Sequence, residues 1–334
     1  MNESKFNIND KSISNNDKQV GSSENKRMLD KGNAFTTMKA RQTVFLCLFL
    51  LLPMAQFIVF YFGVNFRSIL LAFQTYDLAE TTFKFTGFEN FGNVISDFFI
   101  NKSLLPALVN SLYMFLLSIV SIPLHVVVAY AIFRKIPCSN IFKVILFVPN
   151  IVSSIVFIIC TRELLNKGIP VLFNNASIEL LNPYTSTSFY TVLWFGFWLG
   201  FAGGLVVFLS SMASMPYDVI EYDKLENMNS LQELIYVVMP LIFPTITTYI
   251  VVGLAGFFVN YGHLFSFFGA SNENKLYDTV GLVFFVRIIK ADAGSDVQMM
   301  YPYAAAGGLI FTAITAPITI LTKTLLEKYG PSED

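Results

Sequence analysis

Neutral polar and aromatic side chains interrupt the long apolar runs of this sequence, and they are the residues whose chemistry could act there. Such groups suit sugars, because hydroxyls form hydrogen bonds with amides and alcohols, and the C–H faces of a sugar ring stack on aromatic side chains. Amino-acid or phosphate ligands would favour a fixed charge instead. The residues that could line such a passage are Asn150, Ser153, Ser154, Trp194, Trp198, Asn260 and Tyr261.

Each of these residues also has an ordinary structural explanation. Trp and Tyr near the end of a membrane span commonly anchor it at the interface, and Ser or Asn inside a span commonly bonds a neighbouring helix. For His125, in the middle of an apolar run, we expect a hydrogen bond between helices and not a proton carrier. The sequence leaves both explanations open for the passage residues.

A charged stretch from Met215 to Pro244 separates two apolar runs, so it must lie at a membrane surface. Asn227 suits the left-handed turn that ends a helix, and Ser230 with Glu233 fits a capping box that begins another. The pattern therefore predicts a helix, a turn and a second helix that runs into the next span. Such a hairpin could receive force from a soluble partner, although an ordinary amphipathic loop would show the same pattern.

The sequence does not indicate an enzyme. There is no Gly-rich phosphate loop with a Lys and no paired-His motif, and the cysteines Cys47, Cys138 and Cys160 show no paired spacing. We therefore expect no metal and no cofactor bound by this chain. The apolar runs carry almost no charge, which argues against a proton-coupled carrier with a buried carboxylate relay.

The composition is that of a polytopic membrane protein. Hydrophobic residues make up 54% of the 334 residues and charged residues only 13%, about half the usual charged fraction of soluble domains. The net charge of −1 gives no reason to expect nucleic-acid binding. Apolar runs long enough to cross a bilayer predict six spans, over 43–64, 104–133, 141–160, 189–212, 241–265 and 301–325.

These spans divide the chain into four parts. Residues 1–40 are polar and predict a disordered cytoplasmic tail, 41–104 hold the first span and an extracytoplasmic loop, 105–328 form a helical core, and 329–334 form a short tail. Six spans place both termini on one side, and most of the Lys and Arg residues fall there, which predicts cytoplasmic termini. Gly196, Gly200, Gly203 and Gly204 predict a close approach between helices in the fourth span.

Several landmarks resemble those of the permease subunits of binding-protein-dependent ABC importers, of the carbohydrate type. Their signature loop has Glu-Ala-Ala, a Gly after a short gap, and a final Pro. Glu221 stands at the Glu, Tyr222 and Asp223 replace the two Ala, and Asn227 replaces the Gly. The resemblance implies that the residues coupling the permease to an ATPase are Glu221, Tyr222, Asp223, Glu226, Asn227 and Pro240, within a signature loop over 215–240.

Other landmarks lie outside this loop. Phe85 to Phe91 resembles a segment that follows the first span in sugar permeases, and Asn110-Ser-Leu resembles the opening of the family's core. Pro149 followed by Ser153 resembles a pattern of the third span. Tyr277 to Arg287 resembles an outer-loop pattern of permeases for complex carbohydrates, although Arg287 could instead anchor to lipid headgroups.

The resemblance implies an all-α, six-span ABC importer permease fold with a cytoplasmic coupling helix between spans 4 and 5. It implies a permease subunit in a bacterial inner or plasma membrane that forms the path of a sugar or oligosaccharide. Its partners would be a second permease, two ATPase subunits that bind ATP and Mg²⁺, an extracytoplasmic solute-binding protein and the lipid bilayer. A secondary carrier, or a non-transporting degenerate permease or sensor, stays open as an alternative.

Overall fold

The computed structural model describes residues 41–137, 139–174, 179–182, 184–216, 228–269, 276–291 and 297–331. It divides the chain into two compact units, 1–68 and 69–334. The described part of the first unit is helical and belongs to a 31-residue apolar helix, Arg41–Leu71, which is long enough to cross a bilayer. That helix includes a π-helical segment η1 (Phe57–Gly63) and ends in α2 (Val64–Leu71).

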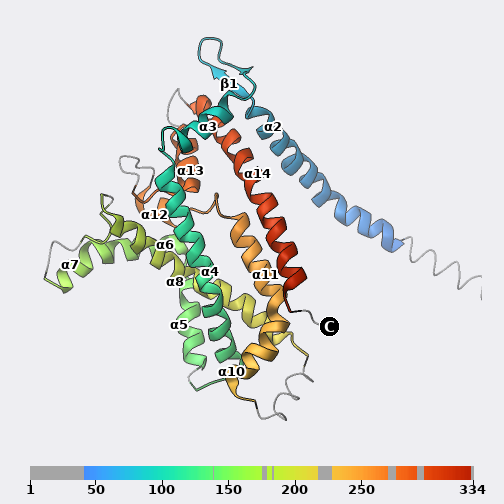
Figure 1. Ribbon diagram of the computed structural model, residues 1–334, viewed down its shortest axis with the longest axis vertical. Helices are drawn as coiled ribbons and strands as arrows, with labels where there is room; N and C mark the ends of the chain where they lie inside the picture. The colour runs from blue at the N-terminus through green and yellow to red at the C-terminus, as the bar shows by residue number, and fades with distance from the viewer. Residues whose placement is uncertain are drawn as a thin grey trace, which may run out of the picture. The chain divides into compact units, whose positions relative to one another are not determined.

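The second unit is almost entirely helical (Figure 1). Its elements are β1 (Gln74–Asp77), β2 (Thr82–Phe85), α3 (Glu89–Phe99), α4 (Leu105–Phe133), α5 (Ser139–Ile151), α6 (Ser154–Glu163), the π-helical η2 (Leu164–Gly168), α7 (Ile169–Leu172), α8 (Ser186–Ala213), α10 (Ser230–Glu233), the π-helical η3 (Leu234–Val238), α11 (Met239–Ala255), α12 (Leu264–Phe268), α13 (Val280–Ala291) and α14 (Val297–Tyr329). Figure 1 shows the hairpin and α3 at one end of this unit and α10 at the other, with α4 running between them.

Within the described residues, five helices are long and apolar enough to span a membrane. They are Arg41–Leu71, Leu105–Phe133, Ser186–Ala213, Ser230–Ala255 and Met300–Tyr329. Each matches one of the predicted spans. The predicted span over 141–160 is wrong as a single helix, because α5 ends at Ile151 and α6 begins at Ser154. The backbone of Ser153 is not helical (φ −53°, ψ 125°), so Ser153 stands at the N-cap position of a new helix.

The predicted fifth span also ends earlier than expected. α11 stops at Ala255, and residues 256–263 are not helical. Gly262 has a left-handed backbone (φ +52°), and Gly281 at the start of α13 comes so close that a Cβ there would lie 2.4 Å from the Val259 carbonyl oxygen. Non-helical backbone at membrane depth is tolerated where protein buries it or where it lines a cavity. The absence of a side chain at Gly281 therefore lets α13 pack closely against this segment.

The predicted loop after the first span is structured. Its β1–β2 hairpin is antiparallel, with Gln74 opposite Phe85, and Gly87 takes the left-handed backbone that was expected of a turn there (φ +68°). Asn90, in the first turn of α3, is buried, and its Nδ2 donates to the carbonyls of Ala72 (3.0 Å) and Gln74 (2.7 Å). The aromatic landmark 85–91 thus connects the hairpin to α3.

α4 packs most extensively against α8, and α11 and α13 both pack against α14. The close approach predicted from glycines is confirmed at Gly204 of α8, where a Cβ would lie 2.5 Å from His125 Nε2 and 2.6 Å from Tyr249 Oη. At Gly200 and Gly203 a Cβ would meet nothing within 4 Å. One glycine therefore decides how closely α8 approaches α4 and α11.

The N-cap of the helix that enters the fourth of these spans lies one residue before the predicted cap, Ser230. Asn229 is the N-cap, and its N–H donates to Gln232 Oε1 at 3.1 Å. Ser230 is the first helical residue, so the predicted Ser230–Glu233 capping box is wrong. Both Asn229-x-x-Gln232 and Ser230-x-x-Glu233 fit the sequence motif, but Glu233 is buried and forms an ion pair with Arg134 of α4.

Candidate functional site

A cavity of about 220 Å³ lies between α4, α8 and the non-helical segment 256–263. Its lining contains no Asp, Glu, Lys or Arg. Both histidines of the chain contribute to it, and they are the residues that could become positively charged there. The polar side chains in its wall are Ser118, Ser121, His125, Tyr249, Asn260 and His263. Phe, Leu, Met and Val side chains and three glycines complete the wall, so the cavity has the apolar surface with few polar groups that is typical of small-molecule sites.

The hydroxyls of α4 face the cavity with their oxygens available as acceptors. Ser118, Ser121 and His125 are spaced by three and four residues, which places them on one face of a helix. Ser118 Oγ donates to the Phe115 carbonyl (2.7 Å), and Ser121 Oγ donates to the Ser118 carbonyl (2.6 Å). Since the hydroxyl hydrogens are used within α4, a ligand would meet these serines as acceptors.

His125 joins α4 to α8, as expected from the sequence. Its Nε2 lies 3.0 Å from the Phe201 carbonyl oxygen, which can only accept, so Nε2 carries the proton. The ring stacks on Phe201 with centroids 4.3 Å apart. His125 is 2% exposed, and its Nδ1 has no hydrogen-bond partner among the residues that the structure describes. The prediction of a helix–helix hydrogen bond is confirmed.

Of the residues predicted to line a passage, Asn260 lies in the cavity wall. Its Oδ1 accepts from the Gly262 N–H (2.9 Å), which leaves the Nδ2 amide as a donor. A second cavity, of about 470 Å³, shares Met114, Ser118, Tyr249 and Asn260 with the first and extends between α4 and α11. Asn260 therefore stands where the two cavities meet.

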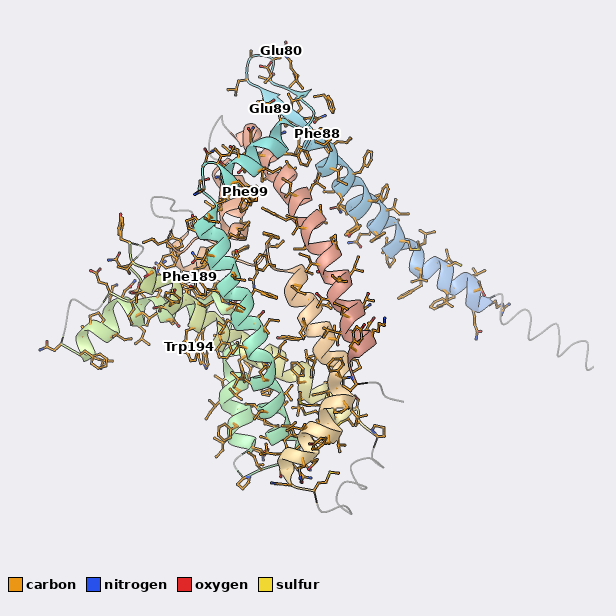
Figure 2. All side chains as sticks on the ribbon, viewed as in Figure 1. Glu80, Phe88, Glu89, Phe99, Phe189 and Trp194 are labelled. Atoms are coloured by element: carbon orange, nitrogen blue, oxygen red, sulfur yellow. The ribbon has the colours of Figure 1, made fainter. Side chains whose placement is uncertain are left out.

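The other predicted passage residues lie elsewhere. Trp194, labelled on α8 in Figure 2, is 67% exposed, and Trp198 is 38% exposed. Ser153 and Ser154 are exposed at the break between α5 and α6. Tyr261 stacks on Phe285 with centroids 4.8 Å apart. The side chain of Asn150 lies outside the described part of the chain. A contact between these residues and a solute stays a prediction.

The sequence analysis missed Ser118, Ser121, Tyr249 and His263. They come from three separate stretches of the sequence, α4, α11 and 256–263, which meet only in the folded structure. The spacing of Ser118, Ser121 and His125 on one helical face was the available signal.

The N-terminal end of α4 is fixed to the segment that precedes α13. Asn110 Nδ2 donates to the carbonyls of Leu276 (3.0 Å) and Asp278 (2.8 Å), and the Val280 N–H donates to Ser111 Oγ (3.0 Å). The Asn110-Ser landmark therefore holds 276–280 against α4. Backbone groups of this segment thus obtain hydrogen-bond partners from side chains of α4.

Arg287 of α13 takes part in a polar cluster with α3 and α14. Asp97 Oδ2 accepts from Tyr303 Oη (2.6 Å) and lies 3.7 Å from Arg287 Nη1, while Asp97 Oδ1 accepts from Asn101 (3.0 Å). Burial acts to raise the pKa of Asp97, but the hydrogen bonds from Tyr303 and Asn101 and the Arg287 charge hold that pKa below its usual value. Arg287 thus has an ion-pair partner inside the protein. Tyr277, at the other end of the landmark that includes Arg287, is buried (2% exposed).

The predicted coupling residues Glu221, Tyr222, Asp223, Glu226 and Asn227 lie outside the described residues. Pro240 is described and occupies the second position of α11. Since proline has no N–H to donate, the helix just before it is adjusted, and the π-helical η3 occupies that place (Leu234–Val238). A coupling role for these residues stays a prediction.

The fold and the cavity define a multi-pass helical membrane protein with an uncharged polar site between its helices. No protein-family model matches the chain. The chain is 23% identical over 289 residues to the multiple sugar-binding transport system permease protein MsmF of Streptococcus mutans, an alignment that covers 84% of this chain and 94% of the relative. It is 27% identical over 209 residues to a probable ABC transporter permease protein of Pyrococcus horikoshii, covering 55% of this chain and 72% of the relative.

Two solved structures have the same fold. One is of a bacterial ABC transporter that imports the acidic polysaccharide alginate (TM-score 0.66, 15% identity, 87% of this chain and 98% of the other). The second is of a bacterial alginate ABC transporter in complex with a periplasmic protein that carries an alginate pentasaccharide (TM-score 0.66, 14% identity, 88% and 98%). The predicted resemblance to ABC transporter permeases of the carbohydrate type is therefore confirmed.

Proposed function

We propose that this chain is a permease subunit of an ATP-driven importer and that it forms part of the path of a neutral sugar or oligosaccharide. The observation that carries this proposal is the cavity between α4, α8 and 256–263, in which hydroxyls, an amide and imidazoles replace fixed charges. The similarity to a sugar-transport permease over 94% of that relative supports the class.

The cavity offers a neutral polyol both kinds of hydrogen bond. Ser118 Oγ and Ser121 Oγ accept, and Asn260 Nδ2 donates. A sugar hydroxyl is both donor and acceptor, so it can use each of these groups. A carboxylate or phosphate would need donors or cations in place of the acceptors of α4.

Six spans are part of the proposal. The five long helices would be joined by a broken third span made of α5 and α6, with its break at Ser153. An even number of spans would then place both termini on the same side, and the excess of Lys and Arg there would make that side the cytoplasm. The signature loop over 215–240, with the coupling helix around Glu221 to Glu226, would lie on the same side.

The proposed complex includes a second permease, two ATPase subunits and an extracytoplasmic binding protein that delivers the solute. ATP and Mg²⁺ would be bound by the ATPase subunits and not by this chain. The alginate transporter solved with a sugar-loaded periplasmic protein supports this arrangement by analogy. Closure of the ATPase dimer would move the helix around Glu221 as a rigid body and would switch access to the cavity.

Uptake by cells tests the function. Cells with and without this chain are given radiolabelled maltose, raffinose and glucuronate, and we expect uptake of a neutral sugar only when the chain is present. Ser118→Ala and Asn260→Ala should each reduce that uptake, whereas Gly203→Ala on α8 should leave it unchanged.

Two further measurements separate the alternatives. Uptake that persists when ATP is depleted but the ion gradient is intact would select a secondary carrier. Failure of the detergent-solubilised chain to co-purify with an ATPase would select a non-transporting protein. Normal uptake and normal sugar-stimulated ATP turnover after Glu221→Lys would refute the coupling role of the signature loop.

A further inference from the structure

A buried ion pair joins the inner ends of α4 and α10. Glu233 Oε2 lies 3.0 Å from Arg134 Nη2. The Glu233 side chain is 6% exposed and that of Arg134 is 34% exposed. Arg134 is the C-cap of α4, where a cation complements the negative end of the helix dipole. Glu233 is the last residue of α10, six positions after the end of the stretch 217–227.

The burial of Glu233 makes this contact hard to break. A buried carboxylate is tolerated when a cation accompanies it, and removal of the cation leaves an uncompensated charge in a low-dielectric surrounding. Tyr130 of α4 and Leu234 and Val238 of η3 belong to the apolar cluster around the pair. Because both the charges and their apolar surroundings hold α10 to α4, the two ends are expected to move together.

Both helices that meet at this pair continue to the cavity. α4 carries His125, Ser121 and Ser118 outward from Arg134. From Glu233 the chain continues through η3 and α11, as one helical stretch, to Tyr249 and then to Asn260. The ion pair is therefore the inner junction of two walls of the cavity.

A π-helical segment follows Glu233 at once. η3 (Leu234–Val238) sits between the ion pair and α11, and π-helical turns occur mostly as single bulges, frequently at functional sites. A wider turn at this place lets the helix change direction after Glu233 while the pair keeps its registry with α4. The contact of α10 with α4 would therefore stay fixed, while the direction of α11 relative to α10 could change.

We propose that Arg134 and Glu233 are a positioning pair that transmits movement of α10 to α4, and through α4 to the cavity. The inference rests on the proposed function, since the movement would come from a partner ATPase. Transmission of this kind requires two discrete packings of the helices, which both the ATPase and the cavity would bias.

The test follows access to the cavity directly. Ser118→Cys is introduced after the native cysteines Cys47, Cys138 and Cys160 are replaced by Ser, and the complex is purified with its ATPase subunits. The rate of labelling by a membrane-impermeant maleimide is measured without nucleotide and with ATP and vanadate. In the otherwise unchanged complex, we expect the nucleotide to change this rate about tenfold or more.

Arg134→Glu should abolish the nucleotide effect on labelling while ATP hydrolysis continues, and so should Glu233→Arg. The double variant Arg134→Glu with Glu233→Arg should restore the effect, because the opposite charges meet again. Lys135→Glu, the same charge change at the next residue, is the matched control and should keep the effect.

A merely structural role gives a different result. The single variants would then lower the amount of assembled complex, while the complex that does assemble would keep the wild-type nucleotide effect; that result overturns the proposal. If the single variants do not assemble, the double variant decides: a restored effect supports the proposal, and its absence in an assembled double variant overturns it. A wild-type complex that hydrolyses no ATP, or whose labelling ignores ATP, would instead refute the proposed function.

Discussion

Each end of the second unit holds an ion pair, and the two pairs differ in distance, burial and partners. In the proposed topology the end with Arg134 and Glu233 is the inner end, and the end with Arg287 and Asp97 is the outer end. At the inner end, Arg134 and Glu233 are 3.0 Å apart, and the carboxylate is buried. At the outer end, Arg287 and Asp97 are 3.7 Å apart, both are about a quarter exposed, and Asp97 has further partners in Tyr303 and Asn101.

The helices joined by the two pairs also differ. The inner pair joins α4 to the helix that becomes α11, and both line the cavities. The outer pair joins α3, α13 and α14, none of which contributes a residue to either cavity. The inner contact holds a buried carboxylate and is costly to lose, which suits the transfer of movement, whereas the outer contact is more exposed and shared among several groups, which suits a fixed scaffold.

Arg134→Met should have the largest effect on stability. It leaves the Glu233 carboxylate buried without its cation, and we expect a loss of about 3 kcal/mol. The matched change at the outer pair, Arg287→Met, should cost about 1 kcal/mol or less, because Asp97 keeps its hydrogen bonds to Tyr303 and Asn101. Thermal unfolding of the purified variants in one detergent measures both. Equal losses would remove the distinction between the two ends.

Gly204→Ala should have the next largest effect on stability. It tests whether α8 is held to the cavity helices α4 and α11 at one point. The added Cβ would lie 2.5 Å from His125 Nε2 and 2.6 Å from Tyr249 Oη, and overpacking of this kind costs about 1–3 kcal/mol. Gly203→Ala, where a Cβ meets nothing within 4 Å, is the control. If both variants unfold at the same temperature, close packing at Gly204 does not stabilise the protein.

Much of the fold could be predicted because a span is a local property of the sequence. About twenty apolar residues suffice, so four of the five long helices were found to within about seven residues at each end. The other, predicted over 241–265, runs from Ser230 to Ala255. The breaks could not be found in this way, since 151–154 and 256–263 hold no Asp, Glu, Lys or Arg, and their few polar residues lie within or beside apolar runs. They depend on close tertiary contacts, such as that of Gly281 with the Val259 carbonyl.

The chemistry of the site could be predicted from the sequence, but the positions of its residues could be predicted only in part. Neutral polar groups within spans were expected, and Asn260 does line the cavity. The aromatic residues were chosen by type, yet Trp194 and Trp198 are exposed on α8. Which face of a nearly uniformly apolar helix turns inward depends on its neighbours, and α8 has no polar stripe that would reveal it.

Asn110→Ala should have a smaller effect and tests the scaffold role of the outer end. The variant loses the hydrogen bonds from Asn110 Nδ2 to the carbonyls of Leu276 and Asp278, and we expect a loss of about 1–2 kcal/mol. Hydrogen exchange of the amides in 276–282 should accelerate while exchange in α10 and η3 stays unchanged. Faster exchange at both ends would mean that the two regions are not independent.

The smallest effect should be the dependence of the outer cluster on pH. The pKa of Asp97 is lowered in the folded protein, so the stability that its ionised form contributes is present above its unfolded pKa, near 4, and is lost as the pH falls through the folded pKa. Between pH 7 and pH 5 the unfolding temperature should therefore not depend on this cluster. Below about pH 4 the wild type should lose stability relative to Asp97→Asn, which has no carboxyl to protonate. Thermal unfolding of both proteins from pH 7 to pH 3 measures the difference, and parallel curves over the whole range would show that the charge of Asp97 does not hold α3, α13 and α14 together.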